Sequence, residues 1–255
     1  MKDNTEGEKN KRHDGSPNTK QPVSGVIEIP DSASEEQFSP EPVATPLVIK
    51  TVRFEKSGSS REHYPTEPPL PQIAFVGKSN VGKSSLFNMV AHRKRLALVS
   101  NTPGRTRLVN FFVVNEEFRL VDLPGYGFAK ASKNIKRSWD SMIGDYLSDT
   151  PDLRLVVALF DIRRDPSDDD IALINWLLHH GIHFIAVLTK SDKLTRSQLG
   201  QVVKQKTQWF GERGALAVLP FSALNRSGIE EILLFLGRTL KKRENPGESG
   251  SQAGT

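Results

Sequence analysis

Residues 77–84 read Gly77-Lys78-Ser79-Asn80-Val81-Gly82-Lys83-Ser84 and lie between the apolar run Ile73–Val76 and a helical pattern that begins at Lys83. The two glycines permit a loop whose backbone N–H groups turn inward, and the start of a helix adds partial positive charge. This spacing, between a strand and a helix, is typical of a loop that holds nucleotide phosphates. We expect Lys83 to reach the β- and γ-phosphate oxygens, and the Ser84 hydroxyl to ligate Mg²⁺. The segment therefore predicts a P-loop nucleotide-binding domain.

Short apolar runs alternate with helical patterns along the rest of the domain. The predicted strands are Ile73–Val76, Leu108–Val114, Phe118–Val121, Leu155–Phe160, Phe184–Leu188 and Leu216–Pro220. The predicted helices are Lys83–Ala91, Lys133–Leu147, Asp168–His180, Arg196–Phe210 and Gly228–Lys242. The strands that flank Asn115-Glu116-Glu117 form a predicted hairpin. The alternation predicts an α/β P-loop NTPase fold, similar to small G proteins, with a mostly parallel mixed sheet flanked by helices on both faces.

The two ends of the chain differ from its middle in composition. Residues 1–46 are acidic and poor in large apolar side chains, so they are predicted to form a disordered extension. Residues 244–255 are predicted to form a disordered tail. Residues 47–243 form the predicted domain, which opens with an edge strand at Leu47–Phe54 and an extended, proline-rich approach at Tyr64–Pro71.

Positive charge is concentrated in this domain. Residues 47–243 hold 30 of the 35 Lys and Arg but only 19 of the 30 Asp and Glu, a net charge of +11 against +5 for the whole chain. Such a domain suits a polyanion, most commonly nucleic acid, although a role in solubility alone stays open. The lack of cysteine excludes disulfides and thiolate metal sites. No apolar run approaches the roughly 20 residues needed to cross a bilayer, and no secretory signal is evident, so we expect a cytoplasmic protein with no membrane partner. We also expect a monomer.

A second motif, Val121-Asp122-Leu123-Pro124-Gly125, stands at the end of a predicted strand. An aspartate there can hold Mg²⁺ through water, and the Gly125 N–H can contact the γ-phosphate. Asp-x-Pro-Gly alone is a common turn, but its place after a P-loop favours the phosphate role. Between the two motifs, Thr106 in Pro103-Gly104-Arg105-Thr106 can add a second hydroxyl to the metal. Ser84 and Thr106 are therefore the predicted metal ligands.

A third set of residues favours guanine as the base. Thr189-Lys190-Ser191-Asp192 follows the predicted strand Phe184–Leu188. A carboxylate at Asp192 can accept from the ring N–H and the exocyclic amine of guanine, a donor pair that adenine lacks, so ATP would leave a buried charge unpaired. Lys190 can lay its aliphatic stem along the base. After the next strand, Phe221-Ser222-Ala223 can offer a backbone N–H to the guanine carbonyl.

Longer runs resemble one family. Residues 77–88, 103–112, 121–130 and 161–170 read GKSNVGKSSLFN, PGRTRLVNFF, VDLPGYGFAK and DIRRDPSDDD, and they are similar to the bacterial EngB/YsxC family, in the class that also holds TrmE, Era and EngA. The resemblance covers residues 47–243. It implies binding of GTP and GDP, slow Mg²⁺-dependent GTP hydrolysis, and a role in assembly of the large ribosomal subunit, with rRNA and ribosomal proteins as partners. It also implies a link to cell division and septation.

The same resemblance assigns the nucleotide-binding residues to five motifs. They are Gly77, Lys78, Ser79, Asn80, Val81, Gly82, Lys83, Ser84, Gly104, Arg105, Thr106, Arg107, Leu108, Asp122, Leu123, Pro124, Gly125, Thr189, Lys190, Ser191, Asp192, Phe221, Ser222 and Ala223. The resemblance further implies that Thr189, where asparagine is commoner in other GTPases, is normal for this family.

Tyr126 follows Gly125 where the best-known small GTPases carry the glutamine that orients the attacking water. Tyrosine cannot do this in the same way, so we expect slow intrinsic hydrolysis and another group supplied on activation. In related GTPases that share the motif, the P-loop asparagine helps bind a K⁺ ion that replaces an arginine finger. Asn80, with Lys83 and Thr106, is therefore a candidate catalytic residue, and K⁺ a candidate cofactor. The alternative, that Asn80 only stabilises the loop, stays open.

Basic residues follow Gly125 at Lys130, Lys133, Lys136 and Arg137, ahead of an amphipathic pattern. We hypothesise that the GTP state presents them to ribosomal RNA, because γ-phosphate contacts order such segments in other switches. A solvated helix face is the alternative. For the whole protein, three other readings stay open: an ATPase or kinase on the same fold, an RNA-binding module stabilised by nucleotide with negligible turnover, and a septation factor at the membrane, for which the chain offers no anchor.

Overall fold

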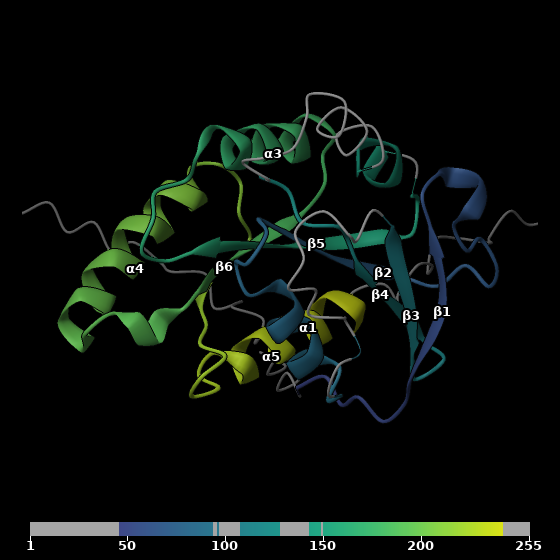
Figure 1. Cartoon of the computed structure of the whole chain (residues 1–255), viewed down its shortest axis with the longest axis horizontal. Helices are drawn as coiled ribbons and strands as arrows, with labels where there is room; N and C mark the ends of the chain where they lie inside the picture. The colour runs from purple at the N-terminus through teal and green to yellow at the C-terminus, as the bar shows by residue number, and fades with distance from the viewer. Residues whose placement is uncertain (1–45, 94–95, 97–107, 128–142, 149, 242–255) are drawn as a thin grey trace, which may run out of the picture. The chain divides into compact units, whose positions relative to one another are not determined.

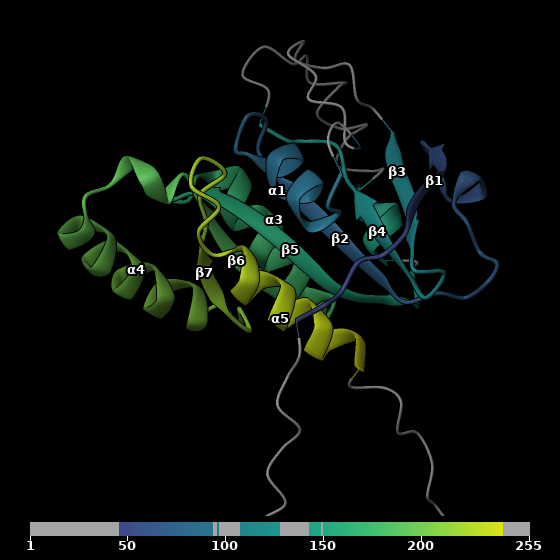
Figure 2. The ribbon, with the colours of Figure 1, turned by 90° about the horizontal axis from the view of Figure 1, so that it is seen from below.

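One mixed β-sheet forms the centre of the described part of the molecule. The computed structural model describes residues 46–93, 96, 108–127, 143–148 and 150–241, all within the compact unit Val43–Thr255. In these residues seven strands pair in the order β1-β3-β4-β2-β5-β6-β7 (Figures 1 and 2; β7 is labelled in Figure 2). Their bounds are β1 Val52–Gly58, β2 Gln72–Gly77, β3 Val109–Val114, β4 Phe118–Asp122, β5 Leu153–Asp161, β6 Phe184–Thr189 and β7 Val218–Pro220.

The directions of these strands agree with the predicted architecture. β2 pairs in parallel with β4 and β5, and the parallel pairing continues through β6 to β7. β3 is antiparallel to both β1 and β4, and the β3–β4 pair forms the predicted hairpin. The α/β fold with a mostly parallel mixed sheet is therefore confirmed.

Helices cover both faces of the sheet. They are α1 Lys83–Val90, α3 Asp168–His179, α4 Arg196–Gly211 and α5 Ile229–Lys241, with a helical stretch at residues 143–148 and short 3₁₀ turns at η1 Arg61–His63 and η2 Ser191–Lys193. The pleat of β2 sends Ile73 and Phe75 into the buried cluster under α1 and α5, and Ala74 and Val76 into the cluster under α3 and α4. Figure 2 shows α1 and α5 in front of the strands, and Figure 1 shows α3 on the opposite side of the sheet. None of the described helices combines the length and apolar character needed to cross a membrane.

The described helices match their predicted bounds to within one residue. α3 begins with a capping box, in which Ser167 Oγ accepts from the Asp170 N–H and Asp170 accepts from the Ser167 N–H (2.8 Å). Thr195 and Gln198 form the same motif at the start of α4. Of the predicted helix Lys133–Leu147, residues 133–142 lie outside the described part, and residues 143–148 are helical.

The prediction of an edge strand over Leu47–Phe54 is wrong in its bounds, since the edge strand is β1, Val52–Gly58. The side chain of Asn115 explains the shift. Its Oδ1 accepts from the N–H groups of Lys50 and Thr51 (2.8 and 3.2 Å), so the turn of the β3–β4 hairpin binds these backbone groups before the strand begins.

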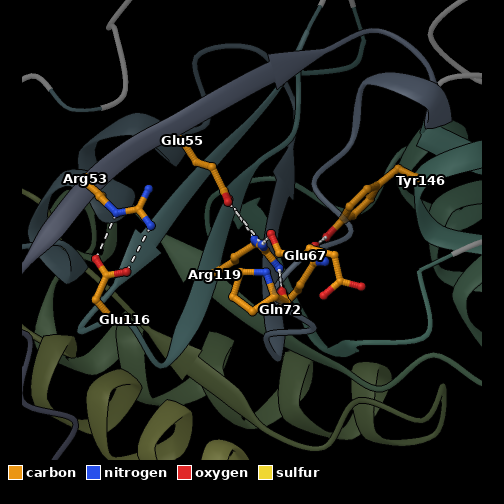
Figure 3. A network of polar contacts seen from close by, with 8 residues as sticks. Arg53, Glu55, Glu67, Gln72, Glu116, Arg119 and Tyr146 are labelled. Carbon is orange, nitrogen blue, oxygen red and sulfur yellow. Dashed lines mark hydrogen bonds and ion pairs between the residues drawn. The ribbon is translucent and has the colours of Figure 1, made fainter.

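A buried arginine joins β4 to the edge strand. Arg119 is fully buried, and its guanidinium donates to the Glu55 carboxylate (2.8 and 3.2 Å) and to the Pro68 carbonyl (2.9 Å), as Figure 3 shows for its contact with Glu55. Glu55 is the extra residue of a β-bulge between Phe54 and Lys56 in the pairing with β3. Bulges redirect side chains, and here the bulge lets Glu55 reach across to β4.

Candidate functional site

The predicted site residues gather at the carboxyl ends of the parallel strands. The last residues of β2, β4 and β6, and the segments that directly follow these strands and β7, contain residues 77–84, 122–126, 189–192 and 221–223, respectively. Because parallel strands point the same way, these loops meet at one edge of the sheet, where α/β proteins bind their ligands. The structure thus brings four of the five predicted segments together.

The P-loop owes its shape to specific residues. Asn80 and Gly82 have left-handed φ angles of 63° and 112°. Glycine adopts this conformation without strain, and asparagine tolerates it better than most residues. A Cβ added to Gly77 would lie 2.9 Å from Val81 Cγ1 and 3.1 Å from the Leu159 carbonyl oxygen, closer than packing allows. One glycine is therefore required by its backbone angle and the other by close packing.

The charged end of the P-loop faces the end of β4. The Lys83 ammonium forms an ion pair with Asp122 Oδ1, and only 11% and 6% of the two side chains are exposed. Ser84 follows in the first turn of α1. Hydroxyl and carboxylate oxygens are ligands of the kind that Mg²⁺ prefers, so this set fits that ion. Within the described residues, no group of three or more His, Cys, Asp or Glu is placed to hold a metal.

Main-chain hydrogen bonds connect Gly125 and Tyr126 to the P-loop. The Ser79 N–H donates to the Tyr126 carbonyl (3.0 Å), and the Tyr126 N–H donates to the Gly77 carbonyl (3.3 Å). A Cβ on Gly125 would lie 3.1 Å from Ser79 Oγ and 3.2 Å from Ser79 N. The backbone of Gly125 thus approaches the P-loop closely, as contact with a phosphate held there requires.

The Tyr126 side chain belongs to the buried cluster under α3. Only 4% of the residue is exposed, and its hydroxyl donates to Asp170 Oδ1 (2.6 Å). Burial, with the Asp170 carboxylate beside it, raises the pKa of Tyr126 well above its ordinary value. Because this phenol is bound to α3, Tyr126 is not available to orient a water molecule as glutamine does.

Thr189 has a role that sequence reasoning missed. Its buried Oγ1 donates to the carbonyl of Val81 in the P-loop (2.7 Å) and lies 3.0 Å from the carbonyl of Phe160 in β5. The sequence placed Thr189 only in the guanine motif. In the structure it also supports the phosphate loop from β6.

The two loops of the predicted guanine site are fixed to each other. The Ser222 hydroxyl donates to Asp192 Oδ1 (2.6 Å), and the Ser191 N–H donates to the Phe221 carbonyl (3.1 Å). The Ser222 hydrogen bond, with Lys193 close by, holds the pKa of Asp192 below its usual range against an opposing effect of burial. Asp192 is therefore a charged acceptor at neutral pH, as pairing with two guanine donors requires.

Asp161 at the end of β5 is a further residue that sequence reasoning missed. Its Oδ2 accepts from Arg163 Nη2 (2.7 Å) and from Lys190 Nζ (3.0 Å). These hydrogen bonds, that of Arg163 foremost, hold the pKa of Asp161 far below its usual range. Asp161 therefore holds the side chain of Lys190, the lysine that is expected to lie along the base. The available signal was its place in the run 161–170, to which the sequence assigned no chemistry.

Part of the predicted site lies outside the described residues. This part contains Gly104, Arg105, Thr106, Arg107 and the basic residues Lys130, Lys133, Lys136 and Arg137. Leu108 is described, and it is exposed just before β3. Both predicted metal ligands, Ser84 and Thr106, and the RNA contacts stay predictions.

Comparison with known proteins identifies the family of this chain. A family model described as "50S ribosome-binding GTPase" matches residues 72–190. The "Probable GTP-binding protein EngB" of Syntrophus aciditrophicus (strain SB) is 51% identical over 189 residues, which cover 73% of this chain and 94% of that protein. The protein of the same name from Geotalea daltonii is 47% identical over 195 residues, with 73% and 93% covered.

Solved structures share the fold. The crystal structure of a probable GTP-binding protein engB superposes with a TM-score of 0.56 at 22% identity, over 68% of this chain and 100% of that one. Era in complex with MgGDPNP and nucleotides 1506–1542 of 16S ribosomal RNA gives 0.55 at 21%, over 70% and 59%. Structures at such identities show the fold alone, whereas the sequence relatives show the family. The chain therefore belongs to the EngB family, and it is a GTPase with a P-loop α/β fold.

Proposed function

We propose that this protein is a nucleotide switch in the assembly of the large ribosomal subunit, which binds its particle with GTP and is reset by slow, Mg²⁺-dependent hydrolysis to GDP. The observation that carries the proposal is the main-chain connection between the P-loop and Gly125–Tyr126. Through it, loss of the γ-phosphate would reach Gly125 and the basic residues that follow it in the sequence. The description of the matched family and the net charge of +11 in residues 47–243 support ribosomal RNA as the partner.

In this proposal each predicted residue contacts a different part of the nucleotide or its metal ion. Asp192 accepts hydrogen bonds from guanine, and Lys190, fixed by Asp161, lies along the base. Lys83 sets its ammonium against the β- and γ-phosphates. Ser84 and Thr106 would hold Mg²⁺, which neutralises phosphate charge when bound. Because the Tyr126 phenol is bound to Asp170, turnover is slow until another group is supplied.

We further propose that the protein is a monomer that acts in the cytoplasm and that residues 47–243 are its GTPase domain. A requirement for normal cell division and septation is part of it and rests on the family resemblance alone.

Sedimentation of cell extract on sucrose gradients tests the switch. Extract is loaded with a non-hydrolysable GTP analogue, with GDP or without nucleotide, and the protein is located by immunoblot. We expect it to move with large-subunit particles only in the presence of the analogue, and we expect Lys83→Met to stay at the top of the gradient. Equal migration under all three conditions would contradict a switch. If the purified protein also released no phosphate from GTP, equal migration would favour the alternative, an RNA-binding module with negligible turnover.

A further inference from the structure

Asp170, in the first turn of α3, contacts two segments of the candidate nucleotide site at once. Its Oδ1 accepts from the Tyr126 hydroxyl (2.6 Å), and its Oδ2 lies 3.5 Å from the Lys78 ammonium of the P-loop. Lys78 also donates to Ser167 Oγ, the other member of the α3 capping box. Only 9% of the Asp170 side chain is exposed. One buried carboxylate therefore joins the P-loop lysine, the tyrosine after β4 and the start of α3.

The main chains of Lys78 and Tyr126 are also joined. Lys78 and Tyr126 form an isolated parallel β-bridge, and Ser79 donates to the Tyr126 carbonyl from both its N–H (3.0 Å) and its hydroxyl (3.2 Å). Gly127 packs against the side chain of Lys78, since a Cβ there would lie 3.1 Å from Lys78 Cγ and Cε. Tyr126 is thus held at two points, by the P-loop at its main chain and by α3 at its phenol. The place of Gly125, the residue before it, depends on both.

We propose that Asp170 is a positioning residue of the nucleotide site, which fixes Tyr126 and Lys78 so that the Gly125 N–H is presented to the γ-phosphate of GTP. This inference rests on the proposed function, in which Gly125 contacts that phosphate. GDP has no γ-phosphate, so loss of Asp170 should weaken the binding of GTP much more than that of GDP. If the carboxylate served only to cap α3, its loss would lower stability and leave the preference between the two nucleotides unchanged.

Two conservative variants of the full-length protein test this role. Tyr126→Phe removes the phenol hydroxyl, and Asp170→Asn keeps the size of the side chain but removes the charge that faces Lys78. Binding of GDP and of a non-hydrolysable GTP analogue is measured by calorimetry in the presence of Mg²⁺. We expect each variant to bind the analogue about tenfold more weakly, as for the loss of one hydrogen bond to a charged group, and to bind GDP within about twofold of the wild type.

Tyr146→Phe is the matched control. It removes another buried tyrosine hydroxyl, which donates to Gln72 Oε1 (3.0 Å) at the start of β2, the end of that strand away from the P-loop. We expect it to lower the melting temperature about as much as Tyr126→Phe but to keep the wild-type ratio of analogue to GDP affinity.

Lys83→Met separates failure of this inference from failure of the proposed function. If Lys83→Met leaves both affinities unchanged, the proposed nucleotide site is wrong. If Lys83→Met abolishes binding while Tyr126→Phe and Asp170→Asn keep the wild-type affinity ratio, the positioning role of Asp170 is overturned and the site stands. A loss shared equally by GDP and the analogue overturns it as well.

Discussion

Asn80 combines a left-handed backbone, with φ of 63°, and an exposed side chain. Its conformation alone would account for asparagine, because the residue tolerates this region. Asn80→Gly separates conformation from chemistry, since glycine keeps the backbone angle and removes the amide. If the amide helps to bind K⁺, phosphate release by the wild type will be faster in K⁺ than in Na⁺, and Asn80→Gly will lose that difference. Equal wild-type rates in the two salts would remove K⁺ from the mechanism.

Thr189 offers a second test at the scale of one residue. Thr189→Val removes the hydroxyl that donates to the Val81 carbonyl (2.7 Å) and leaves that carbonyl without this partner. We expect the free energy of unfolding to fall by about 2 kcal/mol in urea titrations. Because the P-loop is then less firmly held, GDP binding weakens too.

The matched control for Thr189→Val is Thr239→Val in α5, whose hydroxyl donates to the Phe235 carbonyl (3.0 Å) within the helix. Stability changes little there, and GDP affinity does not change. Thr189→Val with wild-type GDP affinity would show that the hydroxyl supports only the core.

At the scale of an element, the attachment of β1 depends on Glu55. Figure 3 shows two ion pairs of β1. The Glu55 carboxylate faces the fully buried Arg119, whereas Arg53 pairs with Glu116 of the β3–β4 turn, and that pair is exposed. Glu55→Gln leaves a buried guanidinium without its counter-charge, so we expect the free energy of unfolding to fall by about 3 kcal/mol. Glu116→Gln is the control and should lower the free energy of unfolding much less, because exposed ion pairs contribute little to stability. Equal losses in the two variants, measured by thermal unfolding, would contradict this account.

The elements themselves could be predicted because their signals are local. The apolar run Ile73–Val76 and the periodicity of α5 each lie within one short stretch of sequence, and both were placed to within one residue. The contacts that organise the site are not local. Thr189 and Val81 are separated by 108 residues, and Tyr126 and Asp170 by 44. Only tertiary packing brings such pairs together, so motif spacing could supply the candidate residues but not the hydrogen bonds among them.

The start of β1 could not be predicted for a similar reason. Leu47–Phe54 alternates as a strand does, but the side chain of Asn115, far along the chain, binds the N–H groups of Lys50 and Thr51. A local sequence pattern does not reveal that a distant side chain takes the hydrogen bonds that a neighbouring strand would otherwise form.

At the scale of the whole molecule, all three tyrosines of the chain have a raised pKa. Burial raises the pKa of Tyr64 to about 12 from an ordinary value of 10.0, and it raises the pKa of Tyr126 and Tyr146 well above that value. A phenol whose pKa is higher in the folded than in the unfolded chain stabilises the fold while neutral. Its contribution is complete below pH 10 and is lost as the pH rises from 10 toward 12.

We therefore expect no phenolate absorbance near pH 10 from the native protein, followed by a cooperative rise at higher pH that coincides with unfolding. The same chain in urea should titrate with a midpoint near the ordinary value of 10.0. Circular dichroism followed along the same titration locates the unfolding step. A native tyrosine that titrates near pH 10 without loss of structure would contradict the burial described above.

The β3–β4 hairpin lies at the end of the sheet opposite to the P-loop, because it precedes β4 and β4 runs parallel to β2. Glu117 is exposed in its turn, and the chain contains no cysteine. Glu117→Cys would therefore carry the sole thiol of the protein, and a maleimide dye attached there would stay clear of the nucleotide. Fluorescence anisotropy of that dye would test the proposed binding to ribosomal particles in real time, so the hairpin is a suitable labelling site for kinetic and single-molecule measurements.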